Sequence, residues 1–298
     1  MATDPINPNL GHMFADFTPF RIATSETEIA GITGGSGPPL LLLHGYPQTH
    51  VMWHRIAPAL AERFTVVAAD LRGYGASGKP PTTLDHAPYS KRAMAQDMLE
   101  VMAALGFDRF DVVAHDRGAR VTHRMALDWP EFVERAVILD IAPTREMYAL
   151  TDEAFARAYW HWFFLIRPAP MPETLIGADP QAFLMSKFRG LGPMIFSDEA
   201  LAAYVEAFTP DAIHASCEDY RAAASIDIDH DNADGDRKVS QPLLVLWGRD
   251  GVIARCFDPL MLWRQRARDV RGRALPGGHY LAEEYPDEVL SAVLEFLG

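Results

Sequence analysis

The sequence is poor in cysteine and in long apolar runs. Its 298 residues contain only Cys217 and Cys256, which excludes a fold built on disulfide bonds and makes a reducing cytoplasm the expected compartment. The longest apolar run, residues 38–43, is far shorter than the roughly 20 residues that span a bilayer. Asp4, Asp16 and several prolines interrupt the first 22 residues, where a signal peptide would be apolar. We therefore expect neither a membrane span nor a secretory leader.

Basic side chains are also scarce. The chain has 27 lysines and arginines against 40 aspartates and glutamates, a formal net charge of −13, and no cluster of basic residues. This balance argues against nucleic acid or an anionic membrane as the partner, so an anionic substrate would have to be attracted by local charge. The content of 49% hydrophobic and 22% charged residues is typical of soluble globular proteins and excludes a disordered chain.

Short apolar runs alternate with helical patterns along most of the chain. The runs fit strands buried on both faces of a sheet and lie at 40–43, 65–69, 110–114, 136–139 and 243–246. Helical patterns lie at 52–62, 91–105 and 119–127, and such alternation indicates a mostly parallel sheet. Residues 17–24 and 28–33 resemble an edge hairpin before the first run. The fold class is therefore α/β.

One long stretch breaks this alternation. Residues 144–238 contain no clear buried strand but do contain helical patterns, for example at 155–166 and 200–208. We expect a helical cap inserted into the α/β core, so that residues 1–143 and 239–298 form the two parts of the core. Within the cap, the proline-rich segment 167–172 and the acidic segment 227–236 are interpreted as loops.

An aspartate lies where a strand, a sharp turn and a helix follow one another. Asp116 comes directly after the run 110–114, and the small residues Ala114, Gly118 and Ala119 permit the tight turn of a nucleophile elbow. Serine that attacked a saturated carbon would leave an ether, whereas aspartate leaves an ester that water can cleave at the enzyme's own carbonyl carbon. Asp116 therefore indicates displacement at carbon.

The second step of such a reaction needs a base and an acid that orients it. His279 follows Gly277 and Gly278 in a late turn, where the base of this architecture falls. Two aspartates could orient it: Asp140 ends the run 136–139, and Asp250 follows the run 243–246. We prefer Asp140, because Asp250 is one residue short of the usual place of a late acid.

The ester intermediate also needs donors for the oxyanion that forms when water attacks it. The motif His44-Gly45-Tyr46-Pro47 follows a predicted strand, and the backbone N–H groups of Tyr46 and Arg117 could supply two donors. This scheme requires neither a metal nor a cofactor.

These motifs together resemble the α/β-hydrolase superfamily and, within it, the fluoroacetate (haloacetate) dehalogenases. The resemblance covers essentially the whole chain. The matching motifs are His44-Gly45-Tyr46-Pro47-Gln48, His115-Asp116-Arg117-Gly118-Ala119-Arg120, Leu139-Asp140-Ile141, Trp160-His161-Trp162, Cys217-Glu218-Asp219-Tyr220-Arg221 and Gly278-His279.

The resemblance implies a role for each site residue. Asp116 would be the nucleophile, His279 the base and Asp140 the acid, and the substrate would be a small haloacid. Arg117 and Arg120 would hold its carboxylate, and His161, Trp162 and Tyr220 would donate hydrogen bonds to the departing halide. The spacing of the two arginines is consistent with this role, because residues i and i+3 share one face of a helix. The resemblance also implies a homodimer.

Three questions stay open at this level. Where these dehalogenases carry a tryptophan that walls the pocket, the chain has Leu191 and a shorter loop, so a roomier pocket could favour chloroacetate, bromoacetate or longer 2-haloacids. An epoxide hydrolase would use the same Asp-His-Asp chemistry with paired cap tyrosines, one of which could be Tyr220, although a neutral epoxide has no carboxylate for Arg117 and Arg120. A homologue that binds ligands without turnover is the third alternative.

Overall fold

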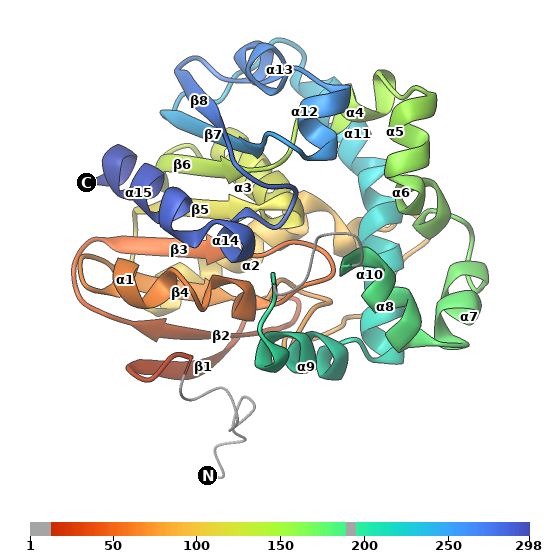
Figure 1. Ribbon diagram of the computed structural model, residues 1–298, viewed down its shortest axis with the longest axis horizontal. Coiled ribbons are helices and arrows are strands. Elements are labelled where there is room, and N and C mark those ends of the chain that lie inside the picture. Colours follow the sequence, from red (N-terminus) through yellow and green to blue (C-terminus); the bar gives the residue numbers. More distant parts are fainter. Residues whose placement is uncertain (1–12, 189–194) are drawn as a thin grey trace.

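Eight strands form one sheet at the centre of the molecule (Figure 1). The computed structural model describes residues 13–188 and 195–298. In spatial order the strands are β1 (Phe17–Ala23), β2 (Glu28–Gly34), β4 (Thr65–Ala69), β3 (Pro39–Leu43), β5 (Phe110–His115), β6 (Val133–Leu139), β7 (Leu243–Gly248) and β8 (Val270–Leu275). The first two form an antiparallel hairpin, β2 pairs antiparallel with β4, and all remaining pairs are parallel. The predicted α/β fold with a mostly parallel sheet is confirmed.

Helices cover both faces of the sheet, which is why the central strands read as continuous apolar runs. The side chains of residues 40–43 in β3 are fully buried, and so are those of residues 112–114 in β5. The short helix α1 (Ala57–Ala61) lies with α15 (Pro286–Leu297) in front of the strands in Figure 1. Behind the strands, α2 (Lys91–Ala104) packs against α3 (Asp116–Asp128).

The predicted helix over residues 52–62 is divided in two. A 3₁₀ turn, η2, spans His50–Trp53, and α1 begins only at Ala57, with Pro58 in its first turn. Pro58 cannot lie in the middle of a continuous helix, because it has no backbone N–H and its ring clashes with the preceding turn. Two short elements therefore replace one longer one.

Eight helices lie between β6 and β7 within the described residues, and no strand does. They are α4 (Thr144–Ala149), α5 (Glu153–Ala158), α6 (Trp160–Leu165), α7 (Met171–Gly177), α8 (Pro180–Phe188), α9 (Asp198–Ala207), α10 (Pro210–Ala223) and α11 (Ile226–Asp234). They gather at one end of the sheet, as Figure 1 shows in green and cyan. The inserted helical region is thus confirmed, and we propose residues 144–238 as the bounds of this cap. The pattern predicted at 155–166 is interrupted at Tyr159, where α5 ends and α6 begins.

The interpretation of residues 227–236 as a loop is wrong for residues 227–234, which lie in α11, and holds only for residues 235 and 236. Asp227 and Asp229 lie in the first turn of this helix, where the helix dipole favours negative charge. Arg124 of α3 forms ion pairs of 2.7 Å with Asp231 and with Asp234. The charges that suggested a solvated loop are instead partly neutralised against the core. The proline-rich segment is non-helical only as far as residue 170, because α7 begins at Met171.

Four shorter elements complete the described chain. They are η3 (Ala87–Tyr89), α12 (Val252–Cys256), α13 (Pro259–Arg266) and α14 (Leu281–Glu284). Over the two described ranges, every helix is too short or too polar to cross a bilayer.

Candidate active site

The predicted nucleophile lies at the junction of β5 and α3. Asp116 is buried and has a φ of 42°, a left-handed conformation that costs a non-glycine residue about 1–3 kcal/mol. The neighbouring chain approaches closely: a Cβ atom on Gly118 would lie 2.6 Å from the carbonyl oxygen of His44, and one on Gly45 would lie 2.5 Å from Cβ of Asp116. Both glycines are therefore needed for the elbow and the loop after β3 to meet.

The Asp116 carboxylate accepts one hydrogen bond and forms one longer ion pair. The backbone N–H of Tyr46 donates to Oδ2 at 3.1 Å, and Nε of Arg120 lies 3.9 Å from Oδ1. Burial alone would raise the pKa of Asp116, but the charges of His279, Arg120 and Arg117 outweigh it and lower that pKa. The carboxylate is therefore ionised at neutral pH and can attack without help from a base.

His279 pairs with Asp140 and not with Asp250. Nδ1 of His279 lies 2.7 Å from Oδ2 of Asp140, whose Oδ1 accepts a hydrogen bond of 2.9 Å from the backbone N–H of Gly248. Burial raises the pKa of Asp140; burial would lower the pKa of His279, but the hydrogen bond and the charge of Asp140 raise it. Asp250 is exposed to solvent. The geometry is that of an imidazole oriented by a buried carboxylate, with Nε2 left to act as a base.

Two further side chains, absent from the sequence prediction, contact this histidine. Nε2 of His115 lies 2.8 Å from the carbonyl oxygen of His279, and because a carbonyl only accepts, Nε2 of His115 carries the proton. Burial lowers the pKa of His115 to about 3, so its ring is neutral. The hydroxyl of Tyr159, between α5 and α6 of the cap, lies 3.3 Å from Nδ1 of His279. Nothing in the local sequence around Tyr159 indicates this contact.

The two arginines beside the nucleophile each keep one buried nitrogen without an acceptor among the described residues. Arg117 binds Asp219 through Nε and Nη2, and its Nη1 is unpaired. Arg120 donates from Nη1 to the hydroxyl of Thr144 at 2.9 Å and to the carbonyl oxygen of Ala142 at 3.2 Å, whereas its Nε makes no hydrogen bond and lies 3.9 Å from Oδ1 of Asp116. A buried charged N–H without an acceptor costs about 1–3 kcal/mol or more, so these atoms are suited to bind an anionic ligand.

The three side chains predicted to bind halide come together above this pair. The ring centroid of Tyr220 lies 5.9 Å from that of His161 and 6.3 Å from that of Trp162. Trp162 and Tyr220 are buried, and burial lowers the pKa of His161 well below its usual value, so its imidazole is neutral. Aromatic faces complete the contacts with the arginines: Arg117 lies 4.2 Å from the Tyr220 ring centroid, and Arg120 lies 4.8 Å from that of Trp162.

Two tyrosine hydroxyls near the site were not predicted. The Oη atoms of Tyr46 and Tyr148 are buried without a partner among the described residues. The Tyr46 ring stacks on His161 with centroids 6.2 Å apart, and the Tyr148 ring lies 5.0 Å from Trp162. Sequence reasoning used only the backbone of Tyr46. Leu191, the predicted change in the pocket wall, lies outside the described residues.

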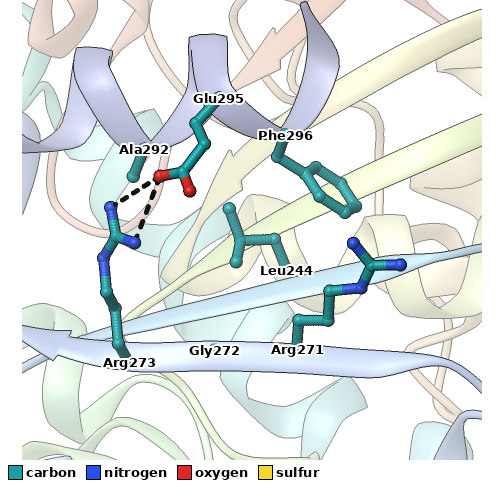
Figure 2. Close-up of a pocket in the computed structure, with 7 residues that line it drawn as sticks. All are labelled: Leu244, Arg271, Gly272, Arg273, Ala292, Glu295 and Phe296. Atoms are coloured by element: carbon teal, nitrogen blue, oxygen red, sulfur yellow. Dashed lines mark hydrogen bonds and ion pairs between the residues drawn. The ribbon is translucent and has the colours of Figure 1, made fainter.

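A hollow elsewhere on the molecule is distinct from this site. Figure 2 shows it between β8 and α15, with a volume of about 240 Å³. Arg271 and Arg273 flank it, and Arg273 pairs with Glu295 at 3.2 Å. Leu244 and Arg271 pair with each other near the beginning of β7 and β8, whereas His279 follows the C-terminal end of β8. The hollow and the predicted site therefore lie at opposite ends of these strands. None of the predicted site residues lines this hollow.

One cluster of described residues has the composition of a metal site. Glu173, His214 and Glu218 bring one ligand atom each within 4.8 Å of the others. However, Nη1 of Arg221 donates to Glu173 at 2.8 Å and to Glu218 at 2.6 Å. A guanidinium thus already supplies the positive charge between the two carboxylates, and the cluster does not include the predicted nucleophile or base.

Comparisons with known proteins identify the family of the chain. A model of the α/β-hydrolase fold family matches residues 38–255. The chain is 47% identical over 289 residues to a fluoroacetate dehalogenase from a Burkholderia species, covering 96% of this chain and 95% of that protein. It is 36% identical over 276 residues to a soluble epoxide hydrolase from Corynebacterium sp. (strain C12), covering 89% and 92%. A crystal structure of an α/β hydrolase from Nostoc sp. PCC 7120 superimposes with a TM-score of 0.94 at 55% identity, covering 95% and 99%.

Proposed function

The chain belongs to the α/β-hydrolase fold family, and from that premise we propose that it is a dehalogenase that hydrolyses a haloacetate to glycolate and halide. One observation carries the proposal: Nη1 of Arg117 and Nε of Arg120 are buried without a hydrogen-bond acceptor among the described residues, and they belong to two arginines whose charges help to lower the pKa of Asp116. A carboxylate has two oxygen atoms and can accept from both arginines. An anionic substrate with a leaving group next to its carboxylate fits this arrangement.

In the first step, a carboxylate oxygen of Asp116 attacks the carbon that bears the halogen. A C–O bond forms, the carbon–halogen bond breaks, and the halide leaves with the bonding electrons. His161, Trp162 and Tyr220 are proposed to donate hydrogen bonds to it, and fluoride needs such donors most because it is the poorest leaving group among the halides. The step requires no proton transfer, since Asp116 is already ionised.

In the second step, water hydrolyses the ester on Asp116. His279 takes a proton from the water through Nε2, and the resulting hydroxide attacks Cγ of Asp116. The backbone N–H of Tyr46, together with that of Arg117, stabilises the oxyanion. The intermediate then collapses: protonated His279 returns its proton to the departing alkoxide oxygen of glycolate, and the remaining hydroxyl proton on Asp116 passes to solvent, which restores the carboxylate. Asp140 holds the imidazole in the required tautomer and stabilises its charged form.

An epoxide hydrolase is the second candidate. The soluble epoxide hydrolase relative favours it, and so does the buried phenol of Tyr220, which could donate to an epoxide oxygen. Against it, a neutral epoxide leaves the unpaired nitrogens of Arg117 and Arg120 without an acceptor. A binding protein without turnover would have no use for the pairing of Asp140 with His279. The homodimer implied by the resemblance stays a prediction.

The deciding experiment measures product release from matched substrates. Purified protein is incubated with fluoroacetate, chloroacetate, bromoacetate and styrene oxide, and halide and diol are quantified beside the Asp116→Asn variant. We expect halide from at least one haloacetate, and none with the variant. Diol formation without halide release would replace the proposal with epoxide hydrolysis. A shift in melting temperature with no product would identify a binding protein.

A further inference from the structure

Asp219 lies on the cap helix α10, yet its main partner is a core arginine. Nε of Arg117 donates to Oδ2 of Asp219 at 2.9 Å, and Nη2 donates to Oδ1 at 2.5 Å and to the backbone carbonyl oxygen at 2.9 Å. Both side chains are fully buried. One edge of the guanidinium is thus completely occupied, and only Nη1 is left for another acceptor.

Two more donors hold the Asp219 carboxylate in place. The hydroxyl of Tyr74, after β4, donates to Oδ2 at 2.6 Å, and Nζ of Lys91, on α2, forms an ion pair with Oδ1. Burial would raise the pKa of Asp219, but the charges of Arg117 and Lys91 outweigh it and hold that pKa well below its usual range. The carboxylate is therefore a fixed, ionised anchor.

Tyr220, the residue after Asp219, also contacts the guanidinium of Arg117. Cζ of Arg117 lies over the Tyr220 ring, 4.2 Å from the ring centroid, so Asp219 binds one edge of the guanidinium and the Tyr220 ring packs against its central carbon. Because Asp219 and Tyr220 both restrain the guanidinium, it has one orientation. The side chain of Arg117 therefore loses less conformational entropy when a ligand binds. A single turn of α10 thus sets the direction of Nη1.

We propose that Asp219 is a positioning residue: it aims Nη1 of Arg117 at the substrate carboxylate, so that docking of the cap completes the substrate site on the core. The inference rests on the proposed function, because it names the support of the carboxylate site. Asp219 does not touch the substrate itself. Its effect should therefore appear in substrate affinity and not in the chemical steps.

The direction in which KM changes distinguishes a positioning role of Asp219 from a purely electrostatic one. Asp219→Asn removes a negative charge near an anionic substrate, so a purely electrostatic role predicts tighter binding and a lower KM. A positioning role predicts the reverse, because the asparagine amide opposes the arginine N–H groups and the guanidinium loses its fixed plane. The double variant Lys91→Met/Asp219→Asn removes one charge of each sign and leaves the local net charge unchanged. It also avoids an unpaired buried lysine, which could prevent folding.

The control is Tyr89→Phe, which removes a buried hydrogen bond to the carbonyl oxygen of Pro80 and leaves the hydrogen bonds between Asp219 and Arg117 intact. We expect KM for the best haloacetate to rise about tenfold or more in the double variant with kcat within about threefold, and to change less than about twofold in Tyr89→Phe. A KM at or below the wild-type value in the double variant overturns the proposal.

A second measurement separates this inference from the proposed reaction. Acetate binding to the wild-type protein and to the same variants is measured by titration calorimetry, which needs no turnover. Weaker binding only in the Asp219 variants supports the positioning role even if the wild-type protein releases no halide. Equal affinity in all variants, together with halide release by the wild-type protein, keeps the dehalogenase proposal and overturns the role of Asp219.

Discussion

The backbone N–H of Tyr46 donates a hydrogen bond of 3.1 Å to Oδ2 of Asp116. One carboxylate oxygen of the predicted nucleophile therefore already lies at the predicted oxyanion donor. The other oxygen, Oδ1, lies 3.9 Å from Nε of Arg120. In the proposed reaction, alkylation of Oδ1 would leave Oδ2 at the backbone N–H of Tyr46, where the oxyanion of the second step would form.

The two steps should be separable by substitution. Asp116→Asn should form no ester and release no halide, whereas His279→Asn should still be alkylated, because attack on carbon needs no base. Mass spectrometry of the intact protein after exposure to haloacetate should show a carboxymethyl adduct on Asp116 in the His279 variant. Asp250→Asn, which changes an exposed aspartate, is the control. No adduct in the His279 variant, with halide release by the wild-type protein, would contradict the two-step scheme.

The acid should be Asp140 and not Asp250. Asp140→Asn removes the charge that orients and stabilises His279, so kcat should fall by roughly 10³-fold or more. Asp250→Asn should change kcat by less than about twofold, because the side chain is exposed. Steady-state kinetics of both variants checks the ranking. The reverse ranking would move the acid to the later strand.

Arg120 should select substrates that carry a carboxylate. Charge-assisted hydrogen bonds contribute on the order of 1.5–3 kcal/mol, so Arg120→Leu should lower kcat/KM for haloacetate by about one to two powers of ten. Neutral haloacetamide should be nearly unaffected. Arg109→Leu, at an exposed arginine, loses the same charge and should behave as wild type, because salt screens distant surface charges over about 8 Å. Equal losses for both substrates would mean that Arg120 maintains the structure of the site and does not bind the carboxylate.

Tyr220 should matter most for the worst leaving group. Tyr220→Phe keeps the ring over Arg117 but removes the hydroxyl, so kcat for fluoroacetate should fall about tenfold and kcat for bromoacetate less than about threefold. Tyr89→Phe is a matched control, since its buried hydroxyl donates to a carbonyl oxygen away from the predicted site. The ratio of the two kcat values is the readout. A ratio unchanged from wild type would remove Tyr220 from the halide site.

The two steps should also differ in pH dependence. Alkylation needs ionised Asp116, whose pKa is lowered, whereas hydrolysis of the ester needs neutral His279, whose pKa is raised. As pH falls, ester hydrolysis should therefore slow at a higher pH than alkylation, and ester should accumulate in acid. Asp140→Asn should move the hydrolysis limb to lower pH, because Asp140 raises the pKa of His279. Single-turnover rates of each step across pH would test this. If both rates fell over the same pH range, the result would contradict the prediction.

The sequence alone determined the elements whose signal is local. Continuous apolar runs predicted the buried strands, because helices on both faces leave no side of a central strand in water. The small residues around Asp116 predicted the elbow, since only small side chains permit that turn. The types of Asp116 and His279 then suggested the chemistry, because an aspartate that attacks carbon still needs a base for the second step.

Only the tertiary structure decided which partners meet. The spacing along the sequence favoured Asp140 over Asp250, but the contact itself depends on which loop lies against His279 at the end of the sheet. Residues 226–234 form a helix whose carboxylates at Asp231 and Asp234 pair with Arg124, about a hundred positions earlier in the chain. The pairing of Asp219 with Arg117 likewise joins cap to core. A local sequence pattern reports only on residues that are close along the chain. A buried charge is stabilised by partners that are distant along the chain and meet only in the folded protein.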